Sequence, residues 1–113
     1  MRGRYPDEIN EEVVARIARG LAAHWSKSQI ANRKSQQITI VVGHDARLSS
    51  PALYKAVQDS FEVRSSKFLV VMPVGLITTP MLYFLVNHHK AAGGIMVTAS
   101  HNPVGWNGLK LAL

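Results

Sequence analysis

The run Gly94-Ile95-Met96-Val97-Thr98-Ala99-Ser100-His101-Asn102-Pro103 is an apolar segment that ends in a polar turn. Its apolar half predicts a buried strand, and Asn102-Pro103 predicts that the strand stops there. Ser100 would then lie at the carboxyl end of a strand, where open α/β sheets bind ligands. Because His101 adjoins this serine and Lys110 follows it in the chain, a hydroxyl, an imidazole and an ammonium group can meet at one place.

Upstream of this run, helical and strand patterns alternate. Asn10 is expected to cap a first helix with an apolar stripe, and Ser50-Pro51 and Thr79-Pro80 are expected to begin two more. Helices are expected over residues 11–25, 50–61 and 79–88, and strands over residues 38–42, 68–72 and 94–100. This alternation predicts an α/β fold with a helix-covered, mainly parallel (mixed) sheet in three layers.

Four local details accompany this prediction. Residues 27–37 and 62–67 are polar and are expected to be solvated connections. Pro73 and Gly75 are expected to stop the second strand, and residues 81–88 are apolar nearly all round, which predicts a well buried helix. Residues 109–113 are strand-like at the terminus, and we expect an unpaired edge there unless more chain covers it.

Composition narrows the class of protein. The chain has 113 residues, 47% hydrophobic residues, no cysteine and a net charge of +6. It shows neither the apolar core of a signal peptide nor a run long enough to cross a bilayer, so we expect a cytoplasmic protein without a membrane partner. The basic residues are scattered and not interleaved with aromatic ones, so a nucleic-acid partner is not expected.

The string Thr98-Ala99-Ser100-His101-Asn102-Pro103, followed by Asn107-Gly108-Leu109-Lys110, resembles the phosphoserine loop of the α-D-phosphohexomutase superfamily, which contains phosphomannomutases and phosphoglucomutases. Three further segments resemble that family in the family's own order. They are residues 2–10 (RGRYPDEIN), 42–50 (VGHDARLSS) and 75–80 (GLITTP). The resemblance therefore covers nearly the whole chain and implies the N-terminal part of the family's domain I.

The resemblance implies an enzyme that interconverts hexose 1-phosphate and hexose 6-phosphate. Ser100 would carry a phosphate, pass it to a phosphorylated hexose and take it back from a bisphosphorylated intermediate. Lys110 would handle a proton and stabilise charge, with His101 in support. Arg2, Arg47 and Asn102 are expected at the substrate, although Asp45 and Arg47 are expected chiefly to organise their loop. Mg²⁺ would bind through the phosphate of Ser100, and a hexose bisphosphate would activate the enzyme.

The family's aspartate-rich metal loop, sugar-choosing loop and C-terminal phosphate-binding loop have no counterpart in this sequence. Residues 1–113 are therefore interpreted as an incomplete domain I, whose partners would be the remaining domains and a phosphorylated hexose. We expect the isolated chain to have negligible mutase activity. The identity of the hexose is left open.

Other functions remain possible from the sequence. A non-catalytic phosphate- or phosphosugar-binding module would use the same loop without phosphorylation of Ser100. A serine hydrolase is not favoured, because Thr98 and Asn102 stand where the Gly-x-Ser-x-Gly pattern needs glycine. A metal site at His88 and His89 is not favoured either, because adjacent side chains on a helix diverge.

Overall fold

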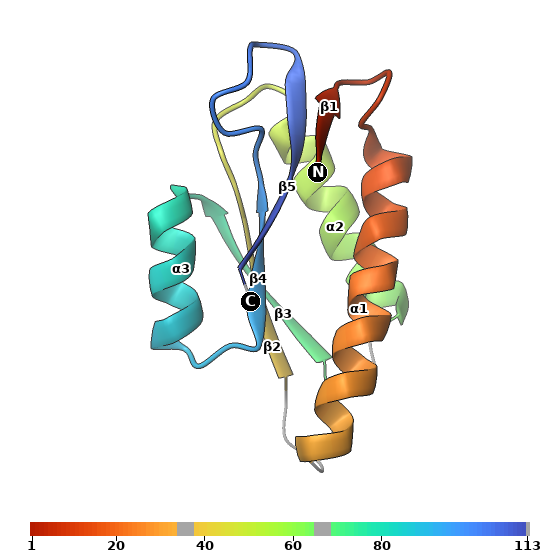
Figure 1. The fold of residues 1–113 in the computed structure, drawn as a ribbon, viewed down its shortest axis with the longest axis vertical. Helices are drawn as coiled ribbons and strands as arrows, with labels where there is room; N and C mark the ends of the chain where they lie inside the picture. The colour runs from red at the N-terminus through yellow and green to blue at the C-terminus, as the bar shows by residue number, and fades with distance from the viewer. Residues whose placement is uncertain (34–37, 65–68, 113) are drawn as a thin grey trace.

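A computed structural model of the chain describes residues 1–33, 38–64 and 69–112. Within these ranges a five-stranded sheet has helices on both faces (Figure 1). The elements in chain order are β1 (Arg2–Arg4), α1 (Glu11–Arg33), β2 (Ile38–His44), α2 (Ser50–Arg64), β3 (Leu69–Leu76), α3 (Thr79–His88), β4 (Gly93–Val97) and β5 (Trp106–Ala112).

The strand order is β1-β5-β4-β2-β3. Strand β2 pairs in parallel with both β3 and β4, whereas β5 pairs antiparallel with both β4 and β1. Strands β2, β3 and β4 run in parallel because α2 and α3 each return the chain to the end of the sheet at which these strands begin. The predicted fold class, an α/β fold with a mixed, helix-covered sheet, is confirmed.

Two apolar cores lie on opposite faces of this sheet. Figure 1 shows α1 and α2 on one face and α3 on the other. In β2, Ile40 and Val42 belong to the core under α1 and α2, whereas Val41 belongs to the core under α3 with Leu82 and Val86. This alternation follows from the two-residue period of a strand that is buried on both faces. The structure is therefore three-layered, as predicted.

Two predicted connections are partly helical. Helix α1 continues to Arg33 and α2 continues to Arg64, so the expectation of connections at residues 27–33 and 62–64 is wrong. Lys, Gln and Arg are good helix formers, and a polar stretch of sequence can therefore extend a helix. Residues 34–37 and 65–68, which contain the rest of these connections and the expected start of a strand at Phe68, lie outside the described residues.

The second predicted strand also runs further than expected. Strand β3 passes through Pro73 and ends at Leu76, with a register shift opposite Val42 and Gly43 of β2. Proline is tolerated there because β3 is at the edge of the described sheet and carries an irregularity at this point. Pro73 therefore does not stop the strand.

Helix α3 differs from its prediction in burial and in its cap. Only Leu82 and Val86 are buried, while Phe84 is 62% exposed, so the expectation of a helix buried nearly all round is wrong. The reason is that α3 is alone on its face among the described helices, so only its inner side is covered (Figure 1). The capping residue is Thr78 and not Thr79, because the Thr78 hydroxyl accepts a hydrogen bond from Met81 N.

The C-terminal strand is paired on both sides. The described part of β5 lies between β4 and β1, so the expectation of an unpaired edge at residues 109–112 is wrong. The prediction missed β1, which is too short to show alternation. Its pairing places Arg2 opposite Gly108 and therefore brings the N-terminus to the serine loop. Within the described ranges, no helix has the length and apolar character needed to cross a bilayer.

Candidate functional site

The serine loop connects β4 to β5. After β4 ends at Val97, the chain turns at Ser100, whose φ of 55° lies in the left-handed region. Asn102 N donates to Ala99 O at 3.1 Å and closes the turn. A left-handed residue other than glycine, Asn or Asp is uncommon and points to a structural or functional requirement.

Five of the six predicted catalytic and substrate-binding residues meet in one pocket. Its volume is about 490 Å³, and it is open to solvent. It is lined by Arg2, Ser100, His101, Asn102, Pro103 and Lys110. The antiparallel pairing of β1 with β5 brings Arg2 here, and the return of β5 from the loop brings Lys110. The sheet therefore brings together residues that are far apart in the sequence.

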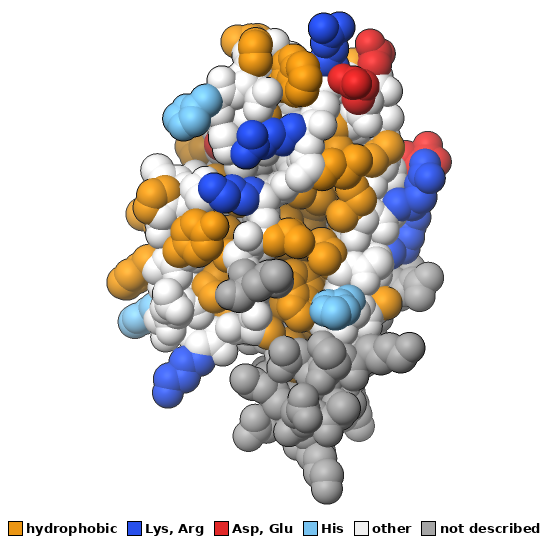
Figure 2. All heavy atoms as spheres, viewed as in Figure 1, with side chains coloured by type: hydrophobic (Ala, Val, Ile, Leu, Met, Phe, Trp, Pro, Cys, Tyr) orange, Lys and Arg blue, Asp and Glu red, His pale blue; other side chains and the backbone are white. Residues whose placement is uncertain are grey.

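Arg2 contacts the serine directly. Its Nη2 donates a hydrogen bond of 3.1 Å to Ser100 Oγ, and its Nη1 lies 3.5 Å from Asn102 Oδ1. None of the described residues lining this pocket is acidic. Figure 2 shows Lys and Arg side chains, a His side chain and some Asp and Glu side chains in the upper half of the visible face. A pocket with this charge suits an anion such as a phosphate.

Arg47 holds the loop from its inner side. Its Nη1 donates to the carbonyl oxygens of Pro103 (3.0 Å) and Trp106 (3.2 Å), and its Nη2 donates to those of Ser100 (2.9 Å) and Asn102 (2.8 Å). The five donors of a guanidinium in a fixed plane make such a multiple contact possible. Arg47 therefore organises the serine loop.

Arg47 is the one predicted site residue that does not line the Ser100 pocket. Four of its hydrogen bonds go to loop carbonyls, and its Nε lies 3.3 Å from Asp45 Oδ2. Nothing in this geometry supports a substrate contact by Arg47. That contact stays a prediction, while the loop-organising role of the same residue is what the geometry supports.

The Asp45 carboxylate accepts several hydrogen bonds on the inner side of the serine loop. Its Oδ1 accepts hydrogen bonds from Ser50 Oγ and Arg47 N, and its Oδ2 accepts one from Thr98 Oγ1 at 2.7 Å. Burial alone raises the pKa of Asp45, but the hydrogen bonds from Ser50, Thr98 and Arg47 N and the charge of Arg47 outweigh it and lower this pKa below its ordinary value. Asp45 is therefore a carboxylate at neutral pH.

Thr98 links this carboxylate to the serine. Its Oγ1 accepts a hydrogen bond of 3.0 Å from Ser100 N while its own proton goes to Asp45. Asn107, which is fully buried, extends the network by donating to Ser49 Oγ at 2.8 Å and to Ser50 Oγ at 3.0 Å. The start of α2 is thus joined to β5 and, through Asp45, to the serine loop by polar contacts that are buried or partly buried.

Sequence reasoning did not assign roles to Thr98 and Ser50. A signal for Thr98 was present, because Thr and Ser hydroxyls commonly bond a backbone N–H two residues away and so favour turns. For Ser50 the sequence predicted only a helix cap. Its hydroxyl instead donates to Asp45, five residues earlier, and accepts from Asn107, and the second of these is a long-range contact without a local signal.

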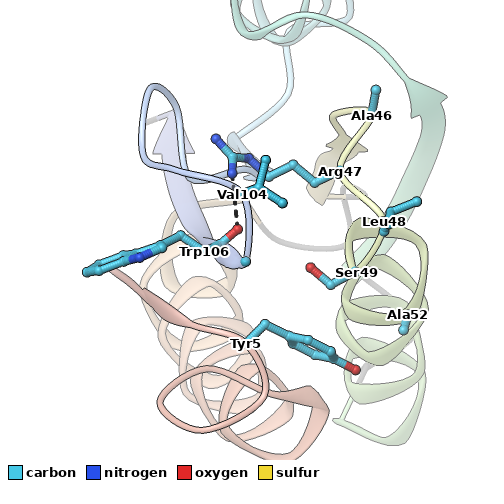
Figure 3. A pocket seen from close by; sticks show the side chains of 9 residues that line it. Tyr5, Ala46, Arg47, Leu48, Ser49, Ala52, Val104 and Trp106 are labelled. Carbon is cyan, nitrogen blue, oxygen red and sulfur yellow. Dashed lines mark hydrogen bonds between the residues drawn. The ribbon is translucent and has the colours of Figure 1, made fainter.

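A second pocket lies on the other side of the loop and is mainly apolar. It is lined by Tyr5, Ala46, Arg47, Leu48, Ser49, Ala52, Val104, Gly105 and Trp106. Figure 3 shows the Arg47 side chain reaching toward the loop that carries Val104 and Trp106, with the hydrogen bond to the Trp106 carbonyl dashed. Arg2 and Lys110, the basic residues that line the Ser100 pocket, do not line this one.

The residues around Ser100 do not form a site for Mg²⁺ by themselves. Magnesium prefers carboxylate, phosphate and water oxygens, whereas the charged groups lining the Ser100 pocket are basic. The oxygens of Asp45 are already engaged by Ser50, Thr98 and Arg47. No group of three or more His, Cys, Asp or Glu side chains in the described part of the chain could hold a metal ion.

Comparison with known proteins gives a consistent family. The model of domain I of the phosphoglucomutase/phosphomannomutase family, described as an alpha/beta/alpha domain, matches residues 1–113. A protein named "Phosphohexose mutases" from Xanthomonas campestris pv. campestris (strain B100) is 44% identical over 111 residues, which are 98% of this chain and 22% of the relative. A phosphoglucomutase from Neisseria gonorrhoeae is 34% identical over 113 residues, which are 100% of this chain and 22% of the relative.

The solved structures agree with the sequence relatives. A putative phosphomannomutase from Thermus thermophilus superposes with a TM-score of 0.83 at 33% identity, over 99% of this chain and 24% of that one. The chain spans about a fifth of the length of the curated sequence relatives that it matches.

Proposed function

Because the chain belongs to the phosphoglucomutase/phosphomannomutase family through its domain I, we propose that it is the phosphoserine-bearing part of a phosphohexomutase. The complete enzyme interconverts hexose 1-phosphate and hexose 6-phosphate. Its relatives carry the names phosphoglucomutase, phosphomannomutase and phosphohexose mutase, and the hexose of this protein is not assigned among them.

One observation carries the proposal. Arg2, His101 and Lys110 line the same pocket as Ser100, and Arg2 Nη2 lies 3.1 Å from the Ser100 hydroxyl oxygen. Phosphoryl transfer needs little covalent help from a protein, but it needs cations around the transferring oxygens and a fixed direction of attack. Two basic residues, Arg2 and Lys110, line this pocket, and Arg47 Nη2 and Thr98 Oγ1 hold the backbone of Ser100, which supports this requirement.

In the proposed reaction, phosphorylated Ser100 gives its phosphoryl group to a free hydroxyl of the hexose monophosphate. The bond between phosphorus and Ser100 Oγ breaks, and a bond from phosphorus to the sugar oxygen forms. The proton of the sugar hydroxyl leaves to a base, and Ser100 Oγ takes up a proton. The bisphosphorylated sugar then reorients and returns its other phosphoryl group to Ser100.

The chain's own residues have separate roles in this scheme. Lys110 handles a proton and stabilises charge beside the phosphoserine, and His101 supports it because an imidazole can both donate and accept a proton. Arg2 holds an oxygen of the phosphate in place of the hydroxyl that it now contacts. Asn102 contacts the substrate from the same pocket.

Further components come from outside these residues. Mg²⁺ would be held by the phosphate on Ser100 together with ligands that the described residues do not provide, and it would supply charge neutralisation. The remaining domains would bind the sugar, and a hexose bisphosphate would load Ser100. The setting we propose is the cytoplasm, with residues 1–113 as part of domain I and without turnover on their own.

The test is phosphorylation of Ser100. The chain is incubated with glucose 1,6-bisphosphate and Mg²⁺, and phosphate is located by intact mass and phosphopeptide mapping, with Ser100→Ala as the control. In parallel, this chain replaces the matching 111 residues of the Xanthomonas relative, and the chimera receives the same treatment.

Phosphate on Ser100 in either protein, absent from the Ser100→Ala variant, supports the mutase function. Binding of the bisphosphate without phosphorylation in both proteins would favour a phosphosugar-binding module. No phosphorylation and no binding in either protein would overturn the proposal.

A further inference from the structure

We propose that the Thr98 hydroxyl is the positioning group that fixes the direction of Ser100 Oγ, and that Asp45 in turn fixes the direction of the Thr98 hydroxyl. This inference rests on the proposed function, because it concerns the orientation of the serine that carries the phosphoryl group. Thr98 does not line the pocket in which Ser100 meets Arg2 and Lys110. It therefore acts through Ser100 and is not a catalytic residue.

The Thr98 hydroxyl donates a hydrogen bond to Asp45 and accepts one from Ser100, and these roles are not interchangeable. A threonine hydroxyl has a single proton, and the 2.7 Å contact with Asp45 Oδ2 uses that proton. The lone pairs of Thr98 Oγ1 are then free to accept, and they accept the Ser100 N–H at 3.0 Å. An ionised Asp45 can only accept, so it cannot reverse this order.

Asp45 is itself held by contacts with α2, with β4 and with the connection that contains Arg47. Ser50 at the start of α2 and the backbone N–H of Arg47 donate to its Oδ1, while its own N–H donates to Val97 O at the end of β4 at 3.1 Å. The charge of Arg47 lies 3.3 Å from its Oδ2. The hydroxyl of Thr98, which is buried, thus faces an acceptor that cannot move freely.

This arrangement matters because of the backbone conformation of Ser100. Its φ of 55° is costly for a residue with a Cβ atom, so a compensating contact is needed to hold it. The bond to Thr98 holds the N–H of Ser100, and Arg47 Nη2 holds its carbonyl oxygen at 2.9 Å. With both backbone groups held, the Cα–Cβ bond points to one place, where Arg2 meets Oγ.

Loss of the Thr98 hydroxyl removes one of the two contacts that hold the backbone of Ser100. The serine can then relax toward negative φ, which swings Oγ away from Arg2 and from the line of phosphoryl transfer. Misplacement of a reacting atom by about 1 Å costs on the order of a hundredfold in rate. The Arg47 contacts remain, so the loop stays attached while its serine points elsewhere.

The first test uses this chain without any phosphate donor. In NMR spectra, a positive φ gives a strong intraresidue contact between the amide and α protons of Ser100. We expect this contact in the wild type and in Thr98→Ser, and its loss in Thr98→Val together with amide exchange at Ser100 faster by about tenfold or more. Thr39→Val, the same change in β2 outside this network, should leave Ser100 as it is. Should Thr98→Val fail to fold, Thr98→Ala replaces it.

The second test measures the rate of Ser100 phosphorylation by glucose 1,6-bisphosphate in the chimera. In Thr98→Val the maximal rate should fall by about 10- to 100-fold while the half-saturating bisphosphate concentration changes by less than about threefold. Thr98→Ser should restore the rate to within about threefold of the wild type. A merely structural role would not give this split or this rescue.

The outcomes separate the two proposals. If neither the chain nor the wild-type chimera is phosphorylated, the proposed function fails, and the NMR comparison still decides whether Thr98 holds Ser100. A Thr98→Val variant that keeps the Ser100 contact, or that is phosphorylated at the wild-type rate, would overturn the positioning role and leave the proposed function intact.

Discussion

The Arg2 guanidinium donates a hydrogen bond of 3.1 Å to Ser100 Oγ across a sequence separation of 98 residues. The contact exists because β1 pairs with β5, the strand that leaves the serine loop, with Arg2 opposite Gly108. The first residues of the chain are therefore part of the wall of the candidate site. An arginine in this place can hold a phosphate on the same serine through charge-assisted hydrogen bonds.

Replacement of Arg2 by Gln should slow the phosphorylation of Ser100 by about tenfold or more, because it removes a charged donor from the transferring oxygens. The stability of the fold should hardly change, since the Arg2 side chain is exposed. The rate is measured in the chimera by quenched-flow mass spectrometry, and the free energy of unfolding is measured in urea.

Arg4→Gln is the matched control for this experiment. Arg4 is also exposed on β1, but it does not line the Ser100 pocket. An equal loss of rate in the two variants would mean that general positive charge, and not the Arg2 contact, accelerates the transfer.

Arg47→Lys should lower the free energy of unfolding by about 1–3 kcal/mol, because a lysine cannot satisfy four loop carbonyls at once. The loss should appear as a lower urea midpoint and as faster amide exchange in residues 100–106. Arg16→Lys, in an exposed pair with Glu12, should change the free energy by no more than about 0.5 kcal/mol. Equal stability of the two variants would contradict the loop-organising role of Arg47.

The stability of the protein should fall in acid in a way that depends on Asp45. Hydrogen bonds and the charge of Arg47 hold its pKa below the ordinary value of 3.8, so the unfolded state binds a proton more readily than the folded state. The contribution of Asp45 is complete above pH 3.8 and is lost as the pH falls through the lower folded pKa. The free energy of unfolding is therefore expected to decrease with falling pH in this window.

Asp45→Asn should flatten this part of the curve of unfolding free energy against pH. The comparison concerns the slope and not the level, because the amide also changes the hydrogen bonds to Thr98 and Ser50. Asp7→Asn, which removes an exposed carboxylate, is the control for the loss of a negative charge. An unchanged slope in Asp45→Asn would show that the carboxylate is not stabilised by its partners.

The fold class and most helix starts could be predicted because they depend on local patterns. Asn10 caps α1 by accepting a hydrogen bond from Val13 N, and the apolar stripe of α1 faces the sheet. The edges of elements were less predictable. Pro73 is tolerated because β3 is an edge strand of the described sheet with a register shift at this point, and Phe84 is exposed because no other described helix covers α3. Both features depend on the tertiary structure and not on local sequence patterns.

The candidate site shows the same division. The loop string identified Ser100, His101, Asn102 and Lys110, which lie close in sequence and line one pocket. The resemblance added Arg2, but only the pairing of β1 with β5 explains how it reaches the serine. The hydrogen bonds from Thr98 to Asp45 and from Asn107 to Ser50 join segments that are distant in sequence, and no local pattern predicts such bonds.

Gly108 offers a test of the connection between β1 and the serine loop. A Cβ atom at this position would collide with the Met1 carbonyl oxygen and would lie 2.8 Å from Arg2 Cα, so β1 would have to move away from β5. Gly108→Ala should therefore lower the free energy of unfolding by about 1–3 kcal/mol and should also reduce Ser100 phosphorylation, because Arg2 loses its place. Gly20→Ala, in α1, meets nothing within 4 Å and should raise the free energy of unfolding by about 0.5–1 kcal/mol without affecting phosphorylation. If Gly108→Ala were phosphorylated as fast as Gly20→Ala, Arg2 would not need its place on β1 to serve the reaction, and the site would have to be built from the loop alone.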